Sequence, residues 1–404
     1  MPTGGGKTIC YAVPALIKPK VTVVIFPLLA LLLDQVERMR SQGLNVCFFM
    51  SDMDEAEREN AMQKLLATPP EYNFLFATPE TVLTPALFEL LQKLSSESLI
   101  NFFVIDEAHC IDTWDSHFRP SYSELSKLQT FGCPILAMTG TATRQTEQVI
   151  LNSLRLSLEE TKVIRKPSNR PNLLFHVVAK KADGKEAIVM PKDLESYVQE
   201  SCRAGRDGND AHCYIFFRFE DKTKHLSNIS SLPDGDRKLV YLNGLNDMVK
   251  YCIIPVYRRQ HIASYFGDGG AGINCAKSCD ICSSGNLEHS IDFSDDAIQI
   301  LNCLDSMQQL QPQVTTKLLV LTFSGSKSNA VISKGLENVN EYGKGKNKFS
   351  EKGLLKFIQC LIIENIVHEQ LPSANENSTT PYLVRGINAS RLTNSELTFL
   401  YYAK

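Results

Sequence analysis

The sequence contains no run of about 18 consecutive apolar residues, the length that a helix needs to cross a bilayer. Its start, MPTGGGKT, lacks the apolar core of a secretory signal, so we expect neither membrane insertion nor secretion. Positive charge is not in excess: the net charge of −3 over 404 residues does not by itself indicate a nucleic-acid partner. A local basic patch would be invisible in that total.

The composition is typical of a globular protein, and the length indicates more than one domain. Hydrophobic residues make up 43% and charged residues 22%, both ordinary values. A length of 404 residues is too great for one compact domain and predicts two or three. The 12 cysteines of a chain that we expect not to be secreted point away from disulfides.

Short apolar runs alternate with helical patterns in the first part of the chain. The runs are rich in β-branched and aromatic residues, which predicts buried strands. They are Val21–Pro27, Asn45–Phe49, Asn73–Ala77, Phe102–Asp106 and Pro134–Met138. Between them lie helix candidates such as LLALLLDQVERMRSQ and DEAERENAMQKLLA. This alternation predicts an α/β domain whose parallel sheet is covered on both faces.

A glycine-rich segment near the start, TGGGKT, matches the core of a phosphate-binding loop. Glycines let successive backbone N–H groups face phosphate oxygens, and the following helix start adds its positive dipole end. Lys7 would reach the β- and γ-phosphates, and the Thr8 hydroxyl would bind Mg²⁺. The predicted ATP-binding residues here are Thr3, Gly4, Gly5, Gly6, Lys7 and Thr8. The strand that normally precedes such a loop would lie before residue 1, so we expect an N-terminally incomplete domain.

A second nucleotide motif, FVIDEAHC, places two carboxylates at the end of a predicted strand. Asp106 would hold Mg²⁺, and Glu107 would orient or deprotonate the attacking water. Each motif alone has a plain alternative, a glycine-rich terminus for the first and a solvated acidic helix start for the second. Their occurrence in this order favours a catalytic ATP site with Lys7, Asp106 and Glu107.

With these motifs, the sequence resembles superfamily 2 helicases, and within them the RecQ family, closest to its Bloom syndrome type. FPLLALLLDQV, FATPE, DEAHC and TGTAT resemble successive helicase motifs. The segment IDTWDSHFRPSY resembles the aromatic-rich loop that couples DNA binding to hydrolysis, which implies DNA contacts for Trp114, Phe118 and Arg119. It departs from the family at Ser116 and His117, where His and Asp are usual.

The segment QESCRAGRDG resembles the last motif of the second helicase domain. By this match Gln199 and Arg203 face the nucleotide, and Arg206 is the arginine finger that stabilises charge on the γ-phosphoryl group. Cys202 stands where the family usually has glycine. The alternative for the two arginines is a solvated basic loop.

The second domain is predicted to be incomplete. RPNLLFHVV resembles its start and MPKDLESYVQES its late part, yet the two are nearly adjacent. The stretch with motifs IV and V, on the order of 100 residues or more for a domain of this kind, is missing between them. Two strands and one helix cannot close a doubly wound sheet.

Four cysteines have the spacing of a metal site. Cys252, Cys275, Cys279 and Cys282 read C-x₂₂-C-x₃-C-x₂-C, which can enclose Zn²⁺ tetrahedrally. Four thiolates leave no open position, so the site is expected to be structural. The alternative is that they are ordinary buried cysteines. The flanking MVKYC and RRQHIASYFGD resemble the RecQ zinc-binding subdomain.

The C-terminal part resembles the winged helix of the same family over KLLVLTFSGSKSNAVISKG. A helix start rich in Ser and Lys can offer N–H groups and ammonium groups to phosphates, so Ser326, Lys327 and Lys334 are predicted DNA contacts. A hairpin, IVHEQL and YLVRGI, is predicted around Asn375, where family members wedge the duplex apart. Its tip has no aromatic residue to stack on a base pair.

Together these observations predict an α/β RecA-like P-loop domain, an incomplete second RecA-like domain, a helical zinc-binding subdomain and a winged helix. The boundaries are 1–165, 166–225, 226–290 and 291–404. The resemblance implies a nuclear, ATP-dependent 3′–5′ DNA helicase of repair, recombination and replication. It would use ATP, Mg²⁺ and Zn²⁺ and act on single-stranded and forked duplex DNA, with no membrane association; protein partners stay open. The alternatives are a non-motor DNA-binding protein derived from a helicase, and an RNA helicase of another branch.

Overall fold

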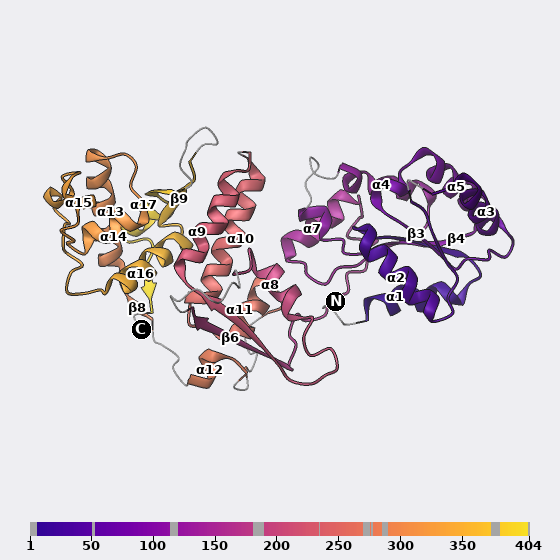
Figure 1. Cartoon of the computed structure of the whole chain (residues 1–404), viewed down its shortest axis with the longest axis horizontal. Helices are drawn as coiled ribbons and strands as arrows, with labels where there is room; N and C mark the ends of the chain where they lie inside the picture. The colour runs from indigo at the N-terminus through magenta and orange to yellow at the C-terminus, as the bar shows by residue number, and fades with distance from the viewer. Residues whose placement is uncertain are drawn as a thin grey trace. The chain divides into compact units, whose positions relative to one another are not determined.

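A computed structural model forms two compact units, each with its own core (Figure 1). The first comprises Met1–Arg170 with Gly205–Asn209 and Ile262–Gly270. The second comprises Pro171–Ala204, Asp210–His261 and Ala271–Lys404. The structure describes residues 6–50, 53–113, 120–180, 190–233, 235–269, 275, 278–284, 290–372 and 380–402.

The first unit is built on a parallel sheet of five strands in the order β2-β3-β1-β4-β5. The strands are β1 (Val21–Ile25), β2 (Val46–Phe48), β3 (Phe74–Ala77), β4 (Ile100–Ile105) and β5 (Ile135–Ala137). Each lies within one of the predicted apolar runs or overlaps it, so the predicted α/β fold is confirmed. Every residue of β1 and β3 is buried, as expected for strands covered on both faces.

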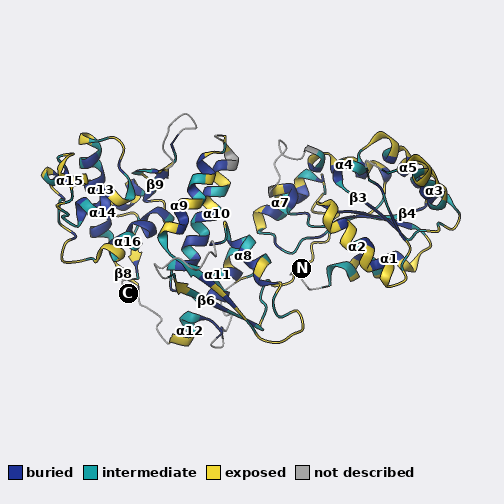
Figure 2. Ribbon diagram, viewed as in Figure 1, coloured by how far each residue is buried: buried dark blue, intermediate teal, exposed yellow. Residues whose placement is uncertain are grey.

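Helices cover both faces of this sheet, and alternate strand residues belong to separate cores. Val23 and Ile25 pack with the apolar side of α5, whereas Val24 and Phe26 pack with α1 and α2. In Figure 2 the strands are dark blue, and the outer faces of these helices are yellow. The helices of this unit are α1 (Lys7–Ile17), α2 (Leu29–Ser41), α3 (Glu55–Leu66), α4 (Pro79–Val82), α5 (Pro85–Ser96), α6 (Cys110–Thr113), the 3₁₀ segment η1 (Pro120–Phe131) and α7 (Arg144–Ser153).

The second unit contains a parallel pair of strands, β6 (Leu173–Ala179) and β7 (Ala211–Phe217), with α8 (Leu194–Ser201) between them in sequence. In the described part of the chain this sheet has two strands, although the far edge of β6 also bridges Cys279 at Phe175. Parallel sheets are normally covered on both faces. Here Tyr214 of β7 is 52% exposed, so one face lacks such a cover.

Four helices follow, α9 (Phe219–Ser230), α10 (Asp236–Ile253), α11 (Arg258–Tyr265) and α12 (Asp280–Ser284). A last bundle then packs three longer helices and a hairpin around Phe357, which contacts the rings of Phe293, Phe399 and Tyr401. Its elements are β8 (Ile291–Asp292), α13 (Ser294–Leu310), α14 (Thr316–Phe323), α15 (Asn329–Ile332), η2 (Leu336–Asn338), α16 (Glu351–Ile363), β9 (Val367–Gln370), β10 (Tyr382–Arg385), α17 (Ala389–Thr393) and β11 (Leu400–Tyr401).

The predicted hairpin is confirmed, because β9 and β10 pair antiparallel from Val367 with Arg385 to Gln370 with Tyr382. Its tip, with Asn375, lies outside the described residues. Ile291 and Asp292, just before this bundle, form a strand that pairs with β11 near the end of the chain. Among the described residues, no helix has the length and apolarity of a membrane span.

Candidate functional site

The first candidate site lies where α1 begins. Gly6 caps the helix with φ 83°, a left-handed conformation that glycine adopts without steric cost. Lys7 is the first helical residue, and its Nζ donates a hydrogen bond to Oε1 of Glu107. The two predicted motifs, 100 residues apart in sequence, are therefore in direct contact.

The acidic motif follows β4 in a tight turn. Asp106 N–H donates to the carbonyl of Ile25 at 2.9 Å, and Ala108 N–H donates to that of Met138 at 2.8 Å. Between these anchors Glu107 has φ 47°, which is unusual for a residue with a side chain. Such local strain persists when the surrounding structure holds it, and it concentrates at functional sites.

The two adjacent carboxylates have opposite electrostatic environments. Burial, and then the negative charge of Glu107, raise the pKa of Asp106 to about 6. Burial alone would also raise the pKa of Glu107, but the hydrogen bond from His109 and the charge of Lys7 outweigh it and lower that pKa to about 2. Glu107 is thus held ionised.

His109 connects this turn to the next helicase-like motif. Its Nδ1 lies 3.3 Å from Oε2 of Glu107 and 2.9 Å from Oγ1 of Thr139. Thr139 in turn donates to the carbonyl of Thr141 at 2.8 Å. The imidazole of His109 therefore links the Glu107 carboxylate directly to the segment after β5.

The residues present fit a magnesium ion. Oδ1 of Asp106 is buried and has no hydrogen-bond partner among the described residues. A buried carboxylate oxygen without a donor is costly unless a cation uses it, and Mg²⁺ prefers such hard oxygen ligands. Thr8 and Asp106 both lie near Tyr11. Burial and the charge of Asp106 raise the pKa of Tyr11, and a hydrogen bond with Thr8 lowers it.

The structure describes three of the other predicted nucleotide residues of the helicase domains, Gln199, Arg203 and Arg206. Gln199 lies in α8, and Arg203 and Arg206 are exposed in the loop that follows it. Thr3, Gly4, Gly5, Trp114, Phe118 and Arg119 lie outside the described residues.

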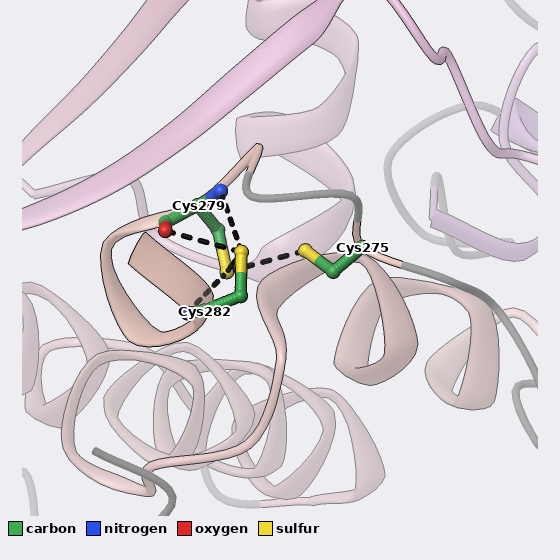
Figure 3. Close-up of side chains that lie close together, drawn as sticks. All are labelled: Cys275, Cys279 and Cys282. Carbon is green, nitrogen blue, oxygen red and sulfur yellow. Dashed lines mark hydrogen bonds between the residues drawn. The ribbon is translucent and has the colours of Figure 1, made fainter. Parts of the chain in front are cut away.

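A second candidate site gathers three cysteines in the second unit. The sulfurs of Cys275 and Cys279, and those of Cys279 and Cys282, are each 3.3 Å apart and point toward one another (Figure 3). Cys279 N–H also donates to the sulfur of Cys282 at 3.2 Å. The hydrogen bond from Cys275 lowers the pKa of Cys279 to about 5. Clustered cysteine sulfurs are a donor set that Zn²⁺ prefers.

The predicted fourth ligand, Cys252, is not part of this group. The potential ligand atoms of the other three lie within 4.8 Å of one another, and the sulfur of Cys252 does not share that arrangement. Cys252 is instead buried near the end of α10, and burial raises its pKa to about 12. The four-cysteine ligand set stays a prediction, of which the described structure brings three sulfurs together. Among the described residues, the cysteines form no disulfide.

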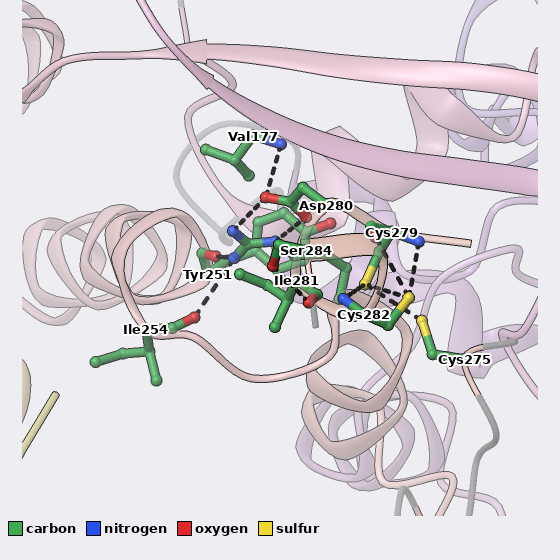
Figure 4. A network of polar contacts seen from close by, with 10 residues as sticks. Val177, Tyr251, Ile254, Cys275, Cys279, Asp280, Ile281, Cys282 and Ser284 are labelled. Carbon is green, nitrogen blue, oxygen red and sulfur yellow. Dashed lines mark hydrogen bonds and ion pairs between the residues drawn. The ribbon is translucent and has the colours of Figure 1, made fainter. Parts of the chain in front are cut away.

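A buried ion pair that the sequence did not predict supports the cysteine group. Arg258 donates to Asp280 through Nε at 2.9 Å and Nη2 at 2.8 Å (Figure 4). The same carboxylate accepts from the N–H of Val177 at 3.3 Å, which ties the cysteine-bearing helix α12 to β6. No local signal could reveal this arrangement, because its three members lie on distant segments.

The third candidate site is a basic surface on the C-terminal bundle. Ser326 and Lys327 lie in the loop between α14 and α15, and Lys334 follows α15. Gly325, with φ 74°, approaches so closely that a Cβ there would lie 2.9 Å from Gly343 Cα and 3.9 Å from the Lys346 side chain. This approach brings a second lysine segment beside the predicted one.

The lysines of this surface differ in their pairing. Lys348 holds Asp296 at 2.6 Å, and Lys344 lies 3.7 Å from Glu341. Lys327, Lys334 and Lys346 are exposed, and in the described parts of the chain they have no ion-pair partner. These three ammonium groups are therefore available to phosphates.

Comparisons with known proteins match this arrangement part by part. Residues 1–149 match the DEAD/DEAH box helicase family, residues 219–283 the RecQ zinc-binding family, and residues 288–398 the RQC domain. The first unit therefore carries the motifs of the DEAD/DEAH box helicase class, and the second unit carries two domains named for RecQ proteins. Within that class, the chain belongs to the RecQ family.

Curated relatives align over nearly the whole chain. The RecQ-like DNA helicase BLM of Xenopus laevis is 28% identical over 98% of this chain and 36% of its own length. The ATP-dependent DNA helicase RecQ of Bacillus subtilis is 26% identical over 91% of this chain and 74% of its own. The ATP-dependent DNA helicase Q-like SIM of Arabidopsis thaliana is 39% identical over 48% of this chain. The chain spans about a third of the Xenopus relative.

Proposed function

We propose that this chain is an ATP-dependent 3′–5′ DNA helicase that acts in DNA repair, recombination and replication. The observation that carries the proposal is the assembly of Lys7, Asp106 and Glu107 from two motifs 100 residues apart. The curated relatives named above are DNA helicases, and the chain carries the exposed lysines of a duplex-binding surface. We also propose a nuclear location by likeness to eukaryotic relatives, although bacterial relatives are similarly close.

In the proposed mechanism Lys7 has two partners. Without nucleotide it neutralises Glu107. When ATP binds, its ammonium turns to the β- and γ-phosphates, which frees the ionised Glu107 carboxylate to orient the attacking water. Asp106 and Thr8 would hold Mg²⁺, which would neutralise charge on the phosphate oxygens.

The remaining predicted residues complete this scheme. Gly4, Gly5 and Gly6, after Thr3, offer backbone N–H groups to the phosphates. Gln199 and Arg203 contact the nucleotide, and Arg206 stabilises the γ-phosphoryl charge. Trp114, Phe118 and Arg119 report DNA occupancy to the acidic turn. Zinc is bound by the cysteine cluster, and Ser326, Lys327 and Lys334 hold duplex DNA by its phosphates.

The test is ATP hydrolysis by the full chain, with and without single-stranded DNA. We expect DNA to stimulate turnover, and Lys7→Ala or Glu107→Gln to lower it about 100-fold or more. Lys93→Ala is the matched control, because Lys93 is an exposed lysine of the same unit that lies 3.0 Å from Glu89 and outside the site. Unchanged hydrolysis in Lys7→Ala would refute the site.

A second candidate function has its own observation in favour. The alignment with the Xenopus relative extends over 505 positions, so that relative has on the order of 100 residues without a counterpart among the 404 here. The two-stranded β6–β7 sheet is consistent with strands lacking from the second helicase domain. The chain would then bind DNA through its winged helix without acting as a motor.

Arg206→Ala distinguishes the two functions. A motor that uses its second domain loses about 1,000-fold or more in turnover when the arginine finger is removed. A non-motor DNA-binding protein binds forked duplex DNA but has no DNA-stimulated hydrolysis, so Arg206→Ala does not change its turnover. A turnover that responds to Lys7→Ala but not to Arg206→Ala would exclude Arg206 as the finger while leaving the first-domain site in place.

A further inference from the structure

Two histidines lie together on the open face of the β6–β7 sheet. His176 of β6 pairs in register with Tyr214 of β7. His212 of β7 pairs in the same way with Leu174 of β6. Because alternate residues of a strand point to one side, this register places both imidazoles on the same face. Nε2 of His176 lies 3.0 Å from Nδ1 of His212, so the two strands bring one nitrogen of each ring together.

Solvent reaches this pair of imidazoles. His212 is exposed and His176 is half-buried. Beside His212 lies a hollow of about 270 Å³, whose lining includes Tyr214 and Glu200. One water molecule takes up about 30 Å³ in the liquid, so the hollow has room for several. A hydrated ion therefore has both a route to the two nitrogens and space for the water that it keeps.

The separation of the two nitrogens fits one metal ion of a particular geometry. Imidazole nitrogens bind transition metals at about 2.0–2.1 Å. Two nitrogens held at that distance and at a right angle lie about 3.0 Å apart, whereas the tetrahedral angle separates them by about 3.4 Å. The observed 3.0 Å corresponds to the right angle. Right angles between neighbouring ligands are typical of square-planar and tetragonal Cu²⁺ and Ni²⁺ sites.

We propose that His176 and His212 form a binding site for a divalent transition-metal ion of tetragonal geometry, Ni²⁺ or Cu²⁺. Nε2 of His176 and Nδ1 of His212 are its protein ligands, and water fills the remaining positions. The ring nitrogen that carries the shared proton releases it, and the other nitrogen of that ring takes one up, so both rings stay neutral. The bound ion joins β6 to β7 and stabilises this sheet by mass action, independently of the proposed ATP hydrolysis.

The first test is a calorimetric titration of Ni²⁺ into the full chain, loaded beforehand with one equivalent of zinc so that the cysteine cluster is occupied. His176→Gln and His212→Gln each remove one of the two protein ligands, so each is expected to lower the Ni²⁺ affinity about 100-fold or more. His225→Gln is the matched control, because Nε2 of His225 already donates to the carbonyl of Met190 at 2.7 Å. Equal affinities of His212→Gln and the unmodified chain would overturn the proposal.

A second measurement uses the unmodified chain and so does not depend on the folding of a variant. Diethyl pyrocarbonate modifies free imidazole nitrogens, and peptide mass spectrometry reports how fast each histidine reacts. Ni²⁺ is expected to protect His176 and His212 together. His368, half-buried in β9, should react at the same rate with and without Ni²⁺. Protection of all three histidines alike, or of neither His176 nor His212, would also overturn the proposal.

Discussion

His261 is a largely buried imidazole whose contacts include the ring of Tyr251 in an edge-on arrangement. Burial, and then the positive charges of Lys250 and Arg258, lower its pKa to about 4. An unfolded chain binds a proton there at about pH 6.5. Between these values the unfolded state holds a proton that the folded state lacks, so stability present above about pH 6.5 is lost as pH falls toward 4.

We therefore expect His261→Gln to flatten the pH dependence of unfolding in that window. The wild-type chain should lose up to about 3 kcal/mol more than the variant between about pH 7 and pH 4. Urea unfolding of both chains, each stripped of metal at every pH, measures the difference. Parallel curves for the two chains would show that His261 titrates normally.

A second prediction at the scale of single residues concerns DNA binding by the basic surface of the C-terminal bundle. Lys327 and Lys346 are exposed beside the close approach of Gly325 and Gly343. Replacing both lysines with alanine removes two phosphate contacts, so the slope of log affinity against log salt should become shallower by about 2. Fluorescence anisotropy with a forked duplex at several salt concentrations measures this slope.

Lys348→Ala is the control for that experiment. Lys348 is part of the same surface, but it already holds Asp296 at 2.6 Å. Its removal should leave the salt slope nearly unchanged. An equal effect of Lys348→Ala would mean that the surface acts by its overall charge rather than through the unpaired lysines.

Between elements, a buried ion pair fastens the C-terminal bundle to α9. Lys222 of α9 donates to Glu369 of β9 at 2.6 Å and to Gln359 of α16 at 2.9 Å. Both charged side chains are 3–4% exposed. Lys222→Met leaves the carboxylate buried without its partner, so we expect a loss of about 3–5 kcal/mol in unfolding free energy.

The double variant Lys222→Met with Glu369→Leu should recover most of that loss, because no charge stays buried. Lys250→Met is the matched control, since Lys250 of α10 reaches Glu364 at 3.4 Å with both side chains exposed. An exposed pair of this kind contributes less than about 1 kcal/mol. Denaturant unfolding of the four chains measures these values, and equal losses in the two single variants would contradict the prediction.

For the whole molecule, the two units have separate cores. We therefore expect a ligand that binds one unit to stabilise that unit and not the other. An ATP analogue with Mg²⁺ at about 100 times its dissociation constant should stabilise the unit containing Lys7 by up to about 2.7 kcal/mol. Hydrogen exchange should therefore slow in β1 and β4 and stay unchanged in α13 and α16. Lys7→Ala should abolish the effect, and equal protection of both cores in the unmodified chain would show that the units unfold together.

The candidate sites could be predicted from the sequence to different extents. The extent depended on how far apart in the sequence the residues of each site lie. Cys279 and Cys282 share one short helix start, so their spacing alone brings the two sulfurs together. The motifs predicted that Lys7 and Glu107 belong to one nucleotide site, and in the structure their side chains are hydrogen-bonded. The sulfur of Cys252 lies outside the cluster of the other three, and its position depends on how α10 packs, which spacing does not report.

The sequence by itself determined the strands of the first unit and the identity of the family. Buried parallel strands must be continuous apolar runs, and a phosphate loop needs glycines before its lysine, so both leave local traces. Only the tertiary structure decided the pairing of β8 with β11 and the Lys222–Glu369 bond. Each of these contacts joins segments that are distant in sequence and meet only when the whole fold packs. A local sequence pattern does not contain the packing energies that bring such segments together.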